Sequence, residues 1–209
     1  MKANENMLQM PIPSQYGWGA VQRMALNWSK QLLFLLCLLP LARMALLFNE
    51  AVNPIEFITR STGTWTLVGL LLTLTITPLR QITGWNRLLQ YRRMLGLLTF
   101  AYAVLHFTTY LWLDQFFDLT AILKDIVKRP FITLGFAAFI LLIPLALTSN
   151  NAAMRQLKRN WGRLHRLIYL IAVLGVLHYV WLVKKDLTQP LIYAACLALL
   201  LAWRVWRRR

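Results

Sequence analysis

The chain has 209 residues, of which 58% are hydrophobic and only 14% are charged. A soluble domain is usually about half apolar and about a quarter charged, so this composition excludes an ordinary soluble domain. The formal net charge of +16 at pH 7 is compatible with nucleic-acid binding until the positions of the charges are considered.

The first 29 residues are mixed and polar, and they contain Pro11, Pro13, Gly17 and Gly19. They lack an apolar core that ends in small residues, which a cleaved signal peptide would have. We therefore predict that residues 1–29 form a cytoplasmic N-terminal lead-in and that residues 30–209 form a single domain.

Six apolar blocks follow the lead-in, each near the length of roughly 20 residues that a helix needs to cross a bilayer. Only short loops separate them, so no second folded domain fits between them. These blocks predict an all-α integral membrane protein, a six-helix transmembrane bundle, with spans at residues 30–48, 62–79, 94–113, 131–147, 167–183 and 190–206.

The charges are distributed unevenly when the connecting segments are assigned alternately to the two sides of the membrane. The side with both termini, residues 79–93 and residues 148–166 carries sixteen basic residues and one acidic residue. The other side carries six of each. Basic residues near span ends mark the cytoplasmic side, so both termini are predicted to be cytoplasmic. This distribution explains the basic charge without a nucleic-acid partner.

Two of the three histidines are predicted to lie at the same depth on different spans. His106 follows Arg93 by 13 residues, which is about 20 Å along a helix. His178 follows Arg166 by 12 residues, which is about 18 Å. Both rings therefore fall in the outer half of the bilayer, whereas His165 lies at the cytoplasmic end of the fifth span.

One histidine from each of two helices is the arrangement that holds a haem iron through two axial imidazoles. Six-coordinate iron has no open position for oxygen, so such a site suits electron transfer. Gly175, near the face of His178, would let a flat macrocycle approach the backbone, or it would simply allow close helix packing.

Histidines that bond between helices or relay protons are the alternative interpretation of this pair. A divalent-metal site is disfavoured, because no carboxylate faces the two rings within a span. A transporter or channel without haem fits the architecture too. It would be expected to have broken helices or paired repeats, which the sequence does not reveal.

A set of short segments, taken in their joint order and spacing, resembles one known family over about residues 62–193. These segments are TGTWTL, TPLR, YRRMLG, KRPFITLG, LALTSN, WGRLHRLIYL, HYVWLVKKD and QPLIYA. On them the chain resembles the MsrQ (YedZ) family, the haem-bearing membrane subunits of bacterial methionine sulfoxide reductase systems. The family pattern leads us to expect glycine at the position of Lys158. This departure affects only the prediction of a local turn.

The resemblance implies a ferric-reductase-like transmembrane domain with haem b in the bacterial inner membrane. It further implies that electrons pass from the respiratory quinol pool to MsrP, a periplasmic molybdopterin enzyme that reduces methionine sulfoxide in oxidised periplasmic proteins. FMN is also associated with the family. The chain would then be the electron-transfer subunit, and sulfoxide reduction would occur in the partner.

The wider superfamily usually places two histidines on each of the two haem-binding helices, and this chain departs from that pattern. Arg92 lies on the same helix face as His106, at the level of the missing ligand, and His165 stands opposite. A guanidinium cannot ligate iron, but it binds propionate, phosphate or quinone oxygens. We expect Arg92, Arg93 and His165 to shape a quinol or flavin site on the cytoplasmic side.

Two other interpretations of Arg92, Arg93 and His165 remain open. The arginines would simply anchor a helix end among lipid headgroups, or His165 would ligate a second haem with an unidentified partner. His165 and His178 are 13 residues apart, so they share a face only if the helix between them bends.

Overall fold

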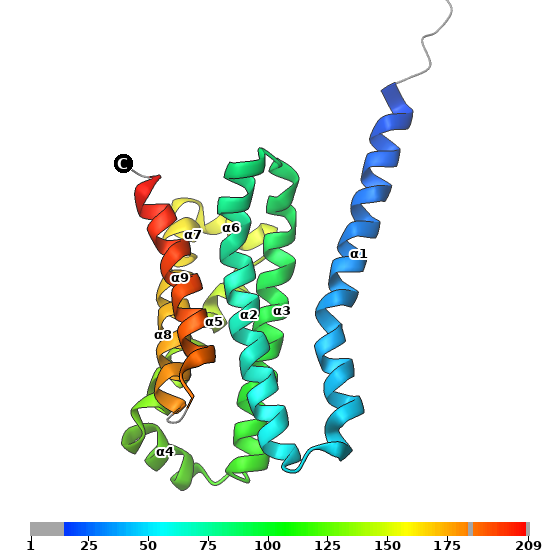
Figure 1. Cartoon of the computed structure of the whole chain (residues 1–209). Coiled ribbons are helices and arrows are strands. Elements are labelled where there is room, and N and C mark those ends of the chain that lie inside the picture. The colour runs from blue at the N-terminus through cyan, green and yellow to red at the C-terminus, as the bar shows by residue number, and fades with distance from the viewer. Residues whose placement is uncertain (1–14, 184–185, 208–209) are drawn as a thin grey trace, which may run out of the picture. The chain divides into compact units, whose positions relative to one another are not determined.

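The computed structural model describes residues 15–183 and 186–207, and this part of the chain is entirely helical (Figure 1). Residues 1–14 of the predicted lead-in lie outside the described residues. The chain divides into two compact units, Met1–Leu39 and Pro40–Arg209. The described part of the first unit is one continuous helix, and the second unit holds all the other elements.

The helices follow one another with short connections. They are α1 (Gln15–Leu47), α2 (Pro54–Thr83), α3 (Leu89–Thr109), α4 (Leu119–Lys128), α5 (Pro130–Leu147), α6 (Asn151–Leu157), α7 (Arg159–Leu164), α8 (Leu167–Leu182) and α9 (Thr188–Trp206). Two 3₁₀ turns, η1 (Phe48–Glu50) and η2 (Asn86–Leu88), precede α2 and α3, and a π-helical turn, η3 (Tyr110–Asp114), ends α3.

The described residues contain six helical segments long and apolar enough to cross a membrane, and each matches one predicted span. They are Trp28–Glu50, Pro54–Thr83, Asn86–Asp114, Pro130–Leu147, Arg159–Leu182 and Thr188–Trp206. The prediction of an all-α, multi-pass membrane protein is therefore confirmed. The second span begins earlier than predicted, because Asn53 caps the helix by accepting the Glu56 N–H and Pro54 occupies its first position.

The segment between the third and fourth predicted spans is more than a short loop, because it contains the helix α4. Asp118 begins the helix by accepting the backbone N–H groups of Thr120 and Ala121. An aspartate cap followed by apolar residues at helical spacing is the signal that identifies this helix.

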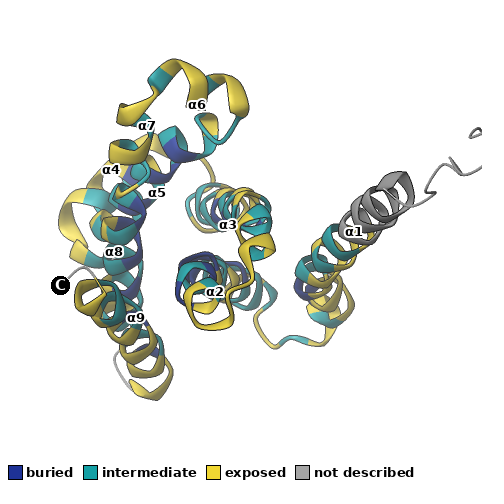
Figure 2. Ribbon diagram, turned by 90° about the horizontal axis from the view of Figure 1, so that it is seen from above, coloured by how far each residue is buried: buried dark blue, intermediate teal, exposed yellow. Residues whose placement is uncertain are grey.

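The core of the second unit lies between two closely packed helix pairs, α2 with α3 and α5 with α8, and α9 packs on α8 and α2. Buried residues line the faces that these helices turn toward one another (Figure 2). Small residues allow the close approach on which helix association in lipid depends. Examples are Ala103, Ala138 and Ala172.

The two ends of this unit differ in charge. The α2–α3 turn, α6, α7 and the last turn of α9 lie together at one end, here called the basic end (Figure 1). The opposite end carries η1, η3 and α4. Both α2 and α5 start at this opposite end and are followed by α3 and α8, which return to it.

Candidate functional site

His106 is fixed to the neighbouring helix through one ring nitrogen. Its Nδ1 lies 2.9 Å from the carbonyl oxygen of Thr59 on α2, and the Thr62 hydroxyl lies 3.4 Å from the same nitrogen. A carbonyl only accepts hydrogen bonds, so Nδ1 carries the proton and donates. The neutral ring therefore keeps Nε2 as a bare lone pair, which is the form that binds a metal.

His178 is fixed in the same way on the other helix pair. Its Nδ1 lies 2.6 Å from the carbonyl oxygen of Phe131, which is in the first turn of α5. The same reasoning leaves Nε2 of His178 without a proton. Both histidines thus present the same nitrogen in the same chemical form.

Two glycines make room for these rings. A Cβ atom placed on Gly63 would lie 2.9 Å from Cε1 of His106, and one on Gly135 would lie 2.8 Å from Nδ1 of His178. Carbon atoms in good contact are about 3.5–4.0 Å apart, so alanine at either position would displace the imidazole. Glycine is required here for close approach.

The two arrangements form an internal repeat that the sequence did not reveal. In both, the histidine follows the residue with the accepting carbonyl by 47 positions. In both, the glycine comes four residues after that carbonyl, and the histidine ends a Val-Leu-His triplet. The pattern is faint in sequence because the two halves share little beyond the glycine and this triplet. The helices run in the same direction in both halves, so the repeat is parallel.

The two histidine rings face each other across the bundle. Their centroids are 6.2 Å apart and their planes meet at 73°. Two bonds of about 2 Å from imidazole nitrogens to one metal atom, together with the ring radii, span a distance of this size. The donor set therefore fits a metal held axially between His106 and His178.

The surroundings of the pair favour a metal already held by a macrocycle. Among the described residues, no group of three or more His, Cys, Asp or Glu side chains could hold an ion. Two neutral imidazoles alone are a poor site for a free divalent cation. Aromatic rings of α3 and α5 pack nearby, with Phe107 and Phe139 centroids 4.6 Å apart. This environment fits a flat apolar ring system with two axial imidazoles.

Gly175 does not line the space between the two histidines. A Cβ atom on it would make ordinary contacts of 3.8 Å with Leu67 and Leu70 of α2. Of the two interpretations of Gly175, the structure therefore supports helix packing. The glycines that touch the imidazoles, Gly63 and Gly135, lie on α2 and α5.

A second polar constellation occupies the basic end, where the structure brings Arg92, Arg93 and His165 to one cavity. The cavity has a volume of about 230 Å³ and lies between α3, α5 and the α6–α7 segment. Ser149, Asn150 and Trp161 add polar groups to its lining. The three residues that the sequence analysis grouped on this level thus share one space.

His165 is held by two contacts on its own side of the cavity. Its ring stacks on Trp161 with a centroid distance of 4.0 Å, and its Nε2 lies 2.9 Å from the Thr148 hydroxyl. That hydroxyl donates its proton to the Pro144 carbonyl at 2.6 Å, so it accepts from Nε2 of His165. In the neutral ring, Nδ1 is then the nitrogen that can accept a proton.

The helix is interrupted at this histidine, so the angle between His165 and His178 counted along one regular helix does not apply. α7 ends at Leu164 and α8 begins at Leu167, so residues 165–166 break the regular helical rotation.

The two arginines of the cavity differ in their exposure. Arg93 is exposed and donates to the Asn151 side chain at 3.2 Å, whereas Arg92 is half-buried.

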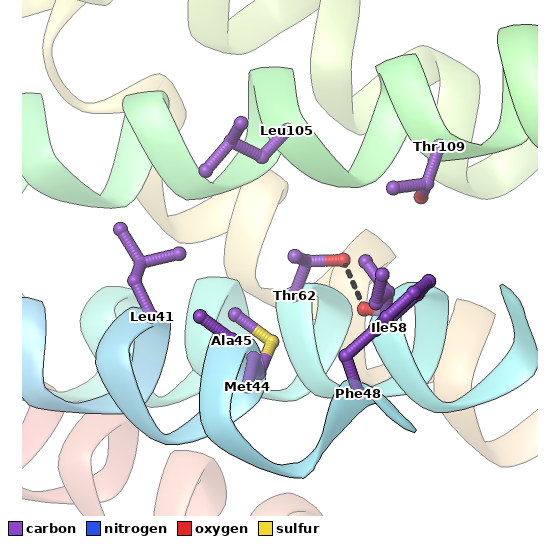
Figure 3. Close-up of a pocket in the computed structure, with 8 residues that line it drawn as sticks. All are labelled: Leu41, Met44, Ala45, Phe48, Ile58, Thr62, Leu105 and Thr109. Carbon is purple, nitrogen blue, oxygen red and sulfur yellow. Dashed lines mark hydrogen bonds between the residues drawn. The ribbon is translucent and has the colours of Figure 1, made fainter. Parts of the chain in front are cut away.

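Another cavity, of about 360 Å³, lies beside the His106 anchor at the opposite end (Figure 3). Its lining is almost wholly apolar and consists of Leu41, Met44, Ala45, Phe48, Ile58, Thr62, Leu105 and Thr109. Thr62 donates to the Ile58 carbonyl at 2.8 Å, so its hydroxyl is already engaged. This cavity offers no charged group, and it suits an acyl chain better than a polar redox donor.

Sequence reasoning missed several residues that build these sites. Gly63 and Gly135 stood in the segments TGTWTL and KRPFITLG without an assigned role, and Trp161 and Thr148 were likewise unassigned. A glycine on a helix that faces a histidine of another span is a usable signal. The accepting carbonyls of Thr59 and Phe131 give no signal, because every residue has one.

Comparison with known proteins places the chain in a family. The ferric reductase like transmembrane component model matches residues 62–176. The protein-methionine-sulfoxide reductase heme-binding subunit MsrQ of Herminiimonas arsenicoxydans is 54% identical over 189 residues, covering 86% of this chain and 87% of that protein. The subunit of the same name from Azospira oryzae is 56% identical over 86% of this chain and 79% of its own length. The one from Bordetella pertussis is 52% identical, covering 88% and 94%. The chain belongs to the MsrQ family within the ferric reductase-like transmembrane proteins.

Proposed function

We propose that this protein is the haem b electron-transfer subunit of a methionine sulfoxide reductase system, with His106 and His178 as the axial ligands. The observation that carries the proposal is the facing pair of imidazoles, 6.2 Å apart, each with Nδ1 bound to a carbonyl of the neighbouring helix. The printed names of the relatives, heme-binding subunits of protein-methionine-sulfoxide reductase, support the same assignment.

Haem held by His106 and His178 would supply reversible one-electron transfer. The residues of this chain orient the ligands, because the Thr59 and Phe131 carbonyls fix the tautomer and the angle of each ring. A hydrogen bond to the far nitrogen also makes an imidazole a stronger donor to the metal. The apolar spans exclude water from both rings.

The cavity at the basic end is proposed as the site where a quinol delivers its electrons. The exposed donors of Arg93 and the half-buried guanidinium of Arg92 are suited to quinone oxygens. Nδ1 of His165 is placed as the acceptor for a quinol proton, because Nε2 is bonded to Thr148. FMN binding rests on the family resemblance alone, and no described residue favours it over a quinol.

Electrons are proposed to leave at the opposite end, toward the periplasmic enzyme MsrP that repairs oxidised proteins. This direction follows from the charge distribution, which assigns the basic end to the cytoplasm of a bacterial inner membrane. His106 and His178 both lie near the ends of their helices on the far side, since α3 ends at Thr109 and α8 at Leu182.

The first test is the absorption spectrum of the purified protein, oxidised and dithionite-reduced. We expect a sharp reduced α-band of low-spin haem b, lost in His106→Ala and in His178→Ala. Leu177→Ala changes an exposed neighbour of His178 and should keep the band. A colourless, folded protein from haem-replete cells would exclude the redox function and favour a transporter or proton relay.

A second test addresses the electron-entry cavity. His165→Gln should slow reduction by a quinol while leaving the spectrum of the His106–His178 haem unchanged, because glutamine does not accept a proton near neutral pH. Wild-type quinol oxidation rates in this variant would exclude the proposed role of His165. A pyridine haemochrome titration that finds two haems, of which His165→Gln removes one, would make His165 a haem ligand.

A further inference from the structure

The helix α4 presents an apolar stripe that no other described part of the protein covers. Leu119, Leu123 and Val127 follow one another at four-residue spacing and are 72%, 64% and 82% exposed. Ile122, on the adjoining face, is 6% exposed and packs against the protein. Lys124 and Lys128 lie about 100° and 140° from Leu123 around the helix, on the flank away from Ile122, so the helix is strongly amphipathic.

Two phenylalanines just before α4 enlarge the apolar surface. Phe116 and Phe117 are 79% and 59% exposed, and their backbone φ angles are +47° and +59°. This left-handed conformation is unfavourable for residues other than glycine. A turn that holds two aromatic side chains outward in this conformation indicates a role at the surface.

The position of α4 is fixed by polar contacts at both ends. Asp118 caps its first turn, and Asp125 accepts from Gln115 at 3.2 Å and pairs with Arg129 at 3.4 Å. The Thr133 hydroxyl of α5 donates to the Ile126 carbonyl. The stripe therefore has a fixed direction relative to the bundle.

The connections of α4 keep it at the surface of the membrane. Only residues 115–118 separate it from the third span, and Arg129 alone separates it from the fifth helix. A four-residue linker reaches at most about 14 Å, so the helix cannot extend far into water. α4 runs across the direction of the spans rather than along them (Figure 1).

We propose that α4, together with Phe116 and Phe117, is an interfacial helix that inserts into the outer-leaflet lipid. An apolar stripe flanked by lysines is typical of helices that lie in the membrane interface, and aromatic residues are favoured at this depth. Lys124 and Lys128 then reach the headgroup phosphates from one flank of the helix. Because α4 leads directly into α5, this anchor sets the level of Phe131, which holds His178.

The test compares single cysteines on the two sides of α4. Leu123→Cys and Lys124→Cys are each made in a Cys37→Ala, Cys196→Ala background and reconstituted in phosphatidylcholine–phosphatidylglycerol vesicles. A water-soluble maleimide is introduced on both sides by freeze–thaw. We expect Leu123→Cys to react about tenfold more slowly than Lys124→Cys, because a thiol in lipid rarely ionises.

Val127→Cys and Lys128→Cys form a second pair, with the same expected contrast. The four variants alter exposed side chains, and equal rates in sodium dodecyl sulfate control for intrinsic reactivity. Equal rates in vesicles would overturn the proposal and leave the stripe as a docking surface for a protein in water. The proposal would also be overturned if Leu123→Cys is labelled slowly at high protein density but rapidly after dilution with lipid, and if oxidation cross-links this variant. A second copy of the chain would then cover the stripe.

Discussion

At the scale of single residues, the geometry of the candidate site depends on two glycines, which lack side chains, as much as on the two histidines. Gly63 and Gly135 bring the backbones of α2 and α5 against the two imidazoles. The Thr59 and Phe131 carbonyls then lie within hydrogen-bond distance of Nδ1. Each ring is held by a steric and a polar constraint at once, which fixes its orientation in a region without water.

Gly63→Ala tests this arrangement, because the added methyl group would meet Cε1 of His106 at 2.9 Å. Displacing a ligand from its orienting partner typically lowers affinity by about 10–100-fold, and we expect a loss of haem of this order. The measurement is the haem content and reduced α-band of the purified variant. Gly135→Ala should behave alike, because the arrangement is repeated at His178.

Gly162→Ala is the control for helix propensity, since a Cβ there meets nothing within 4 Å. It should keep the haem and stabilise its helix by up to about 1 kcal/mol. Full haem occupancy and an unchanged spectrum in Gly63→Ala would show that His106 does not depend on the close approach.

At the scale of the helices, prolines sit inside α1, α2 and α5 without ending them. Pro78 lies within α2 and Pro144 within α5, and each helix continues to Thr83 or Leu147. A proline leaves the carbonyl four residues earlier without its helical donor. For Pro78 that carbonyl belongs to Leu74, and Nη2 of Arg204 on α9 donates to it at 2.6 Å.

This contact predicts a coupling between α2 and α9. Arg204→Leu removes the donor and should destabilise the protein by about 1–3 kcal/mol, because a buried carbonyl loses its partner. Pro78→Ala supplies an N–H that restores the helical bond to Leu74. The double variant should therefore be less destabilised than the sum of the single variants, as measured by thermal unfolding in detergent.

Additive effects in this double-mutant cycle would contradict the pairing of Arg204 with the carbonyl freed by Pro78. Arg204 also donates to the Tyr169 hydroxyl, with its guanidinium 4.7 Å from that ring. Tyr169→Phe measures this second contact separately. It should lower stability without changing the coupling to Pro78.

At the scale of the whole molecule, the distribution of charge and the proposed haem site together imply a direction of electron transfer. The basic end carries the cavity of Arg92, Arg93 and His165, and the His106–His178 pair lies toward the other end. A one-electron carrier with an entry site on one side and its centre displaced toward the other is suited to moving electrons across a membrane.

Fusion to alkaline phosphatase tests the proposed orientation, because this reporter is active only in the periplasm. A fusion after Lys124 in α4 should be active, and a fusion after the last residue of the chain should be inactive. Green fluorescent protein at the C-terminus, which fluoresces when it folds in the cytoplasm, should give the reciprocal result. Activity of the C-terminal phosphatase fusion would reverse the assignment of the two ends.

The apolar blocks were enough to predict the six spans and the levels of the histidines along them. Apolar blocks of bilayer length allow only membrane helices, and a helix rises by a fixed distance per residue. Counting from Arg93 and Arg166 therefore placed His106 and His178 at one level, and the structure brings the centroids of their rings to within 6.2 Å. The grouping of Arg92, Arg93 and His165 came from comparing the chain with the superfamily's histidine pattern, and these three residues share one cavity.

Only the tertiary structure decided what each of these residues touches. The carbonyl that holds each histidine lies 47 residues away on another helix, and the rotation of that helix is set by packing. The setting of His165 likewise depends on a contact beyond its own segment, with the Thr148 hydroxyl. The depth of a residue in the membrane depends only on its own helix, whereas the residue that it contacts depends on how two helices pack together.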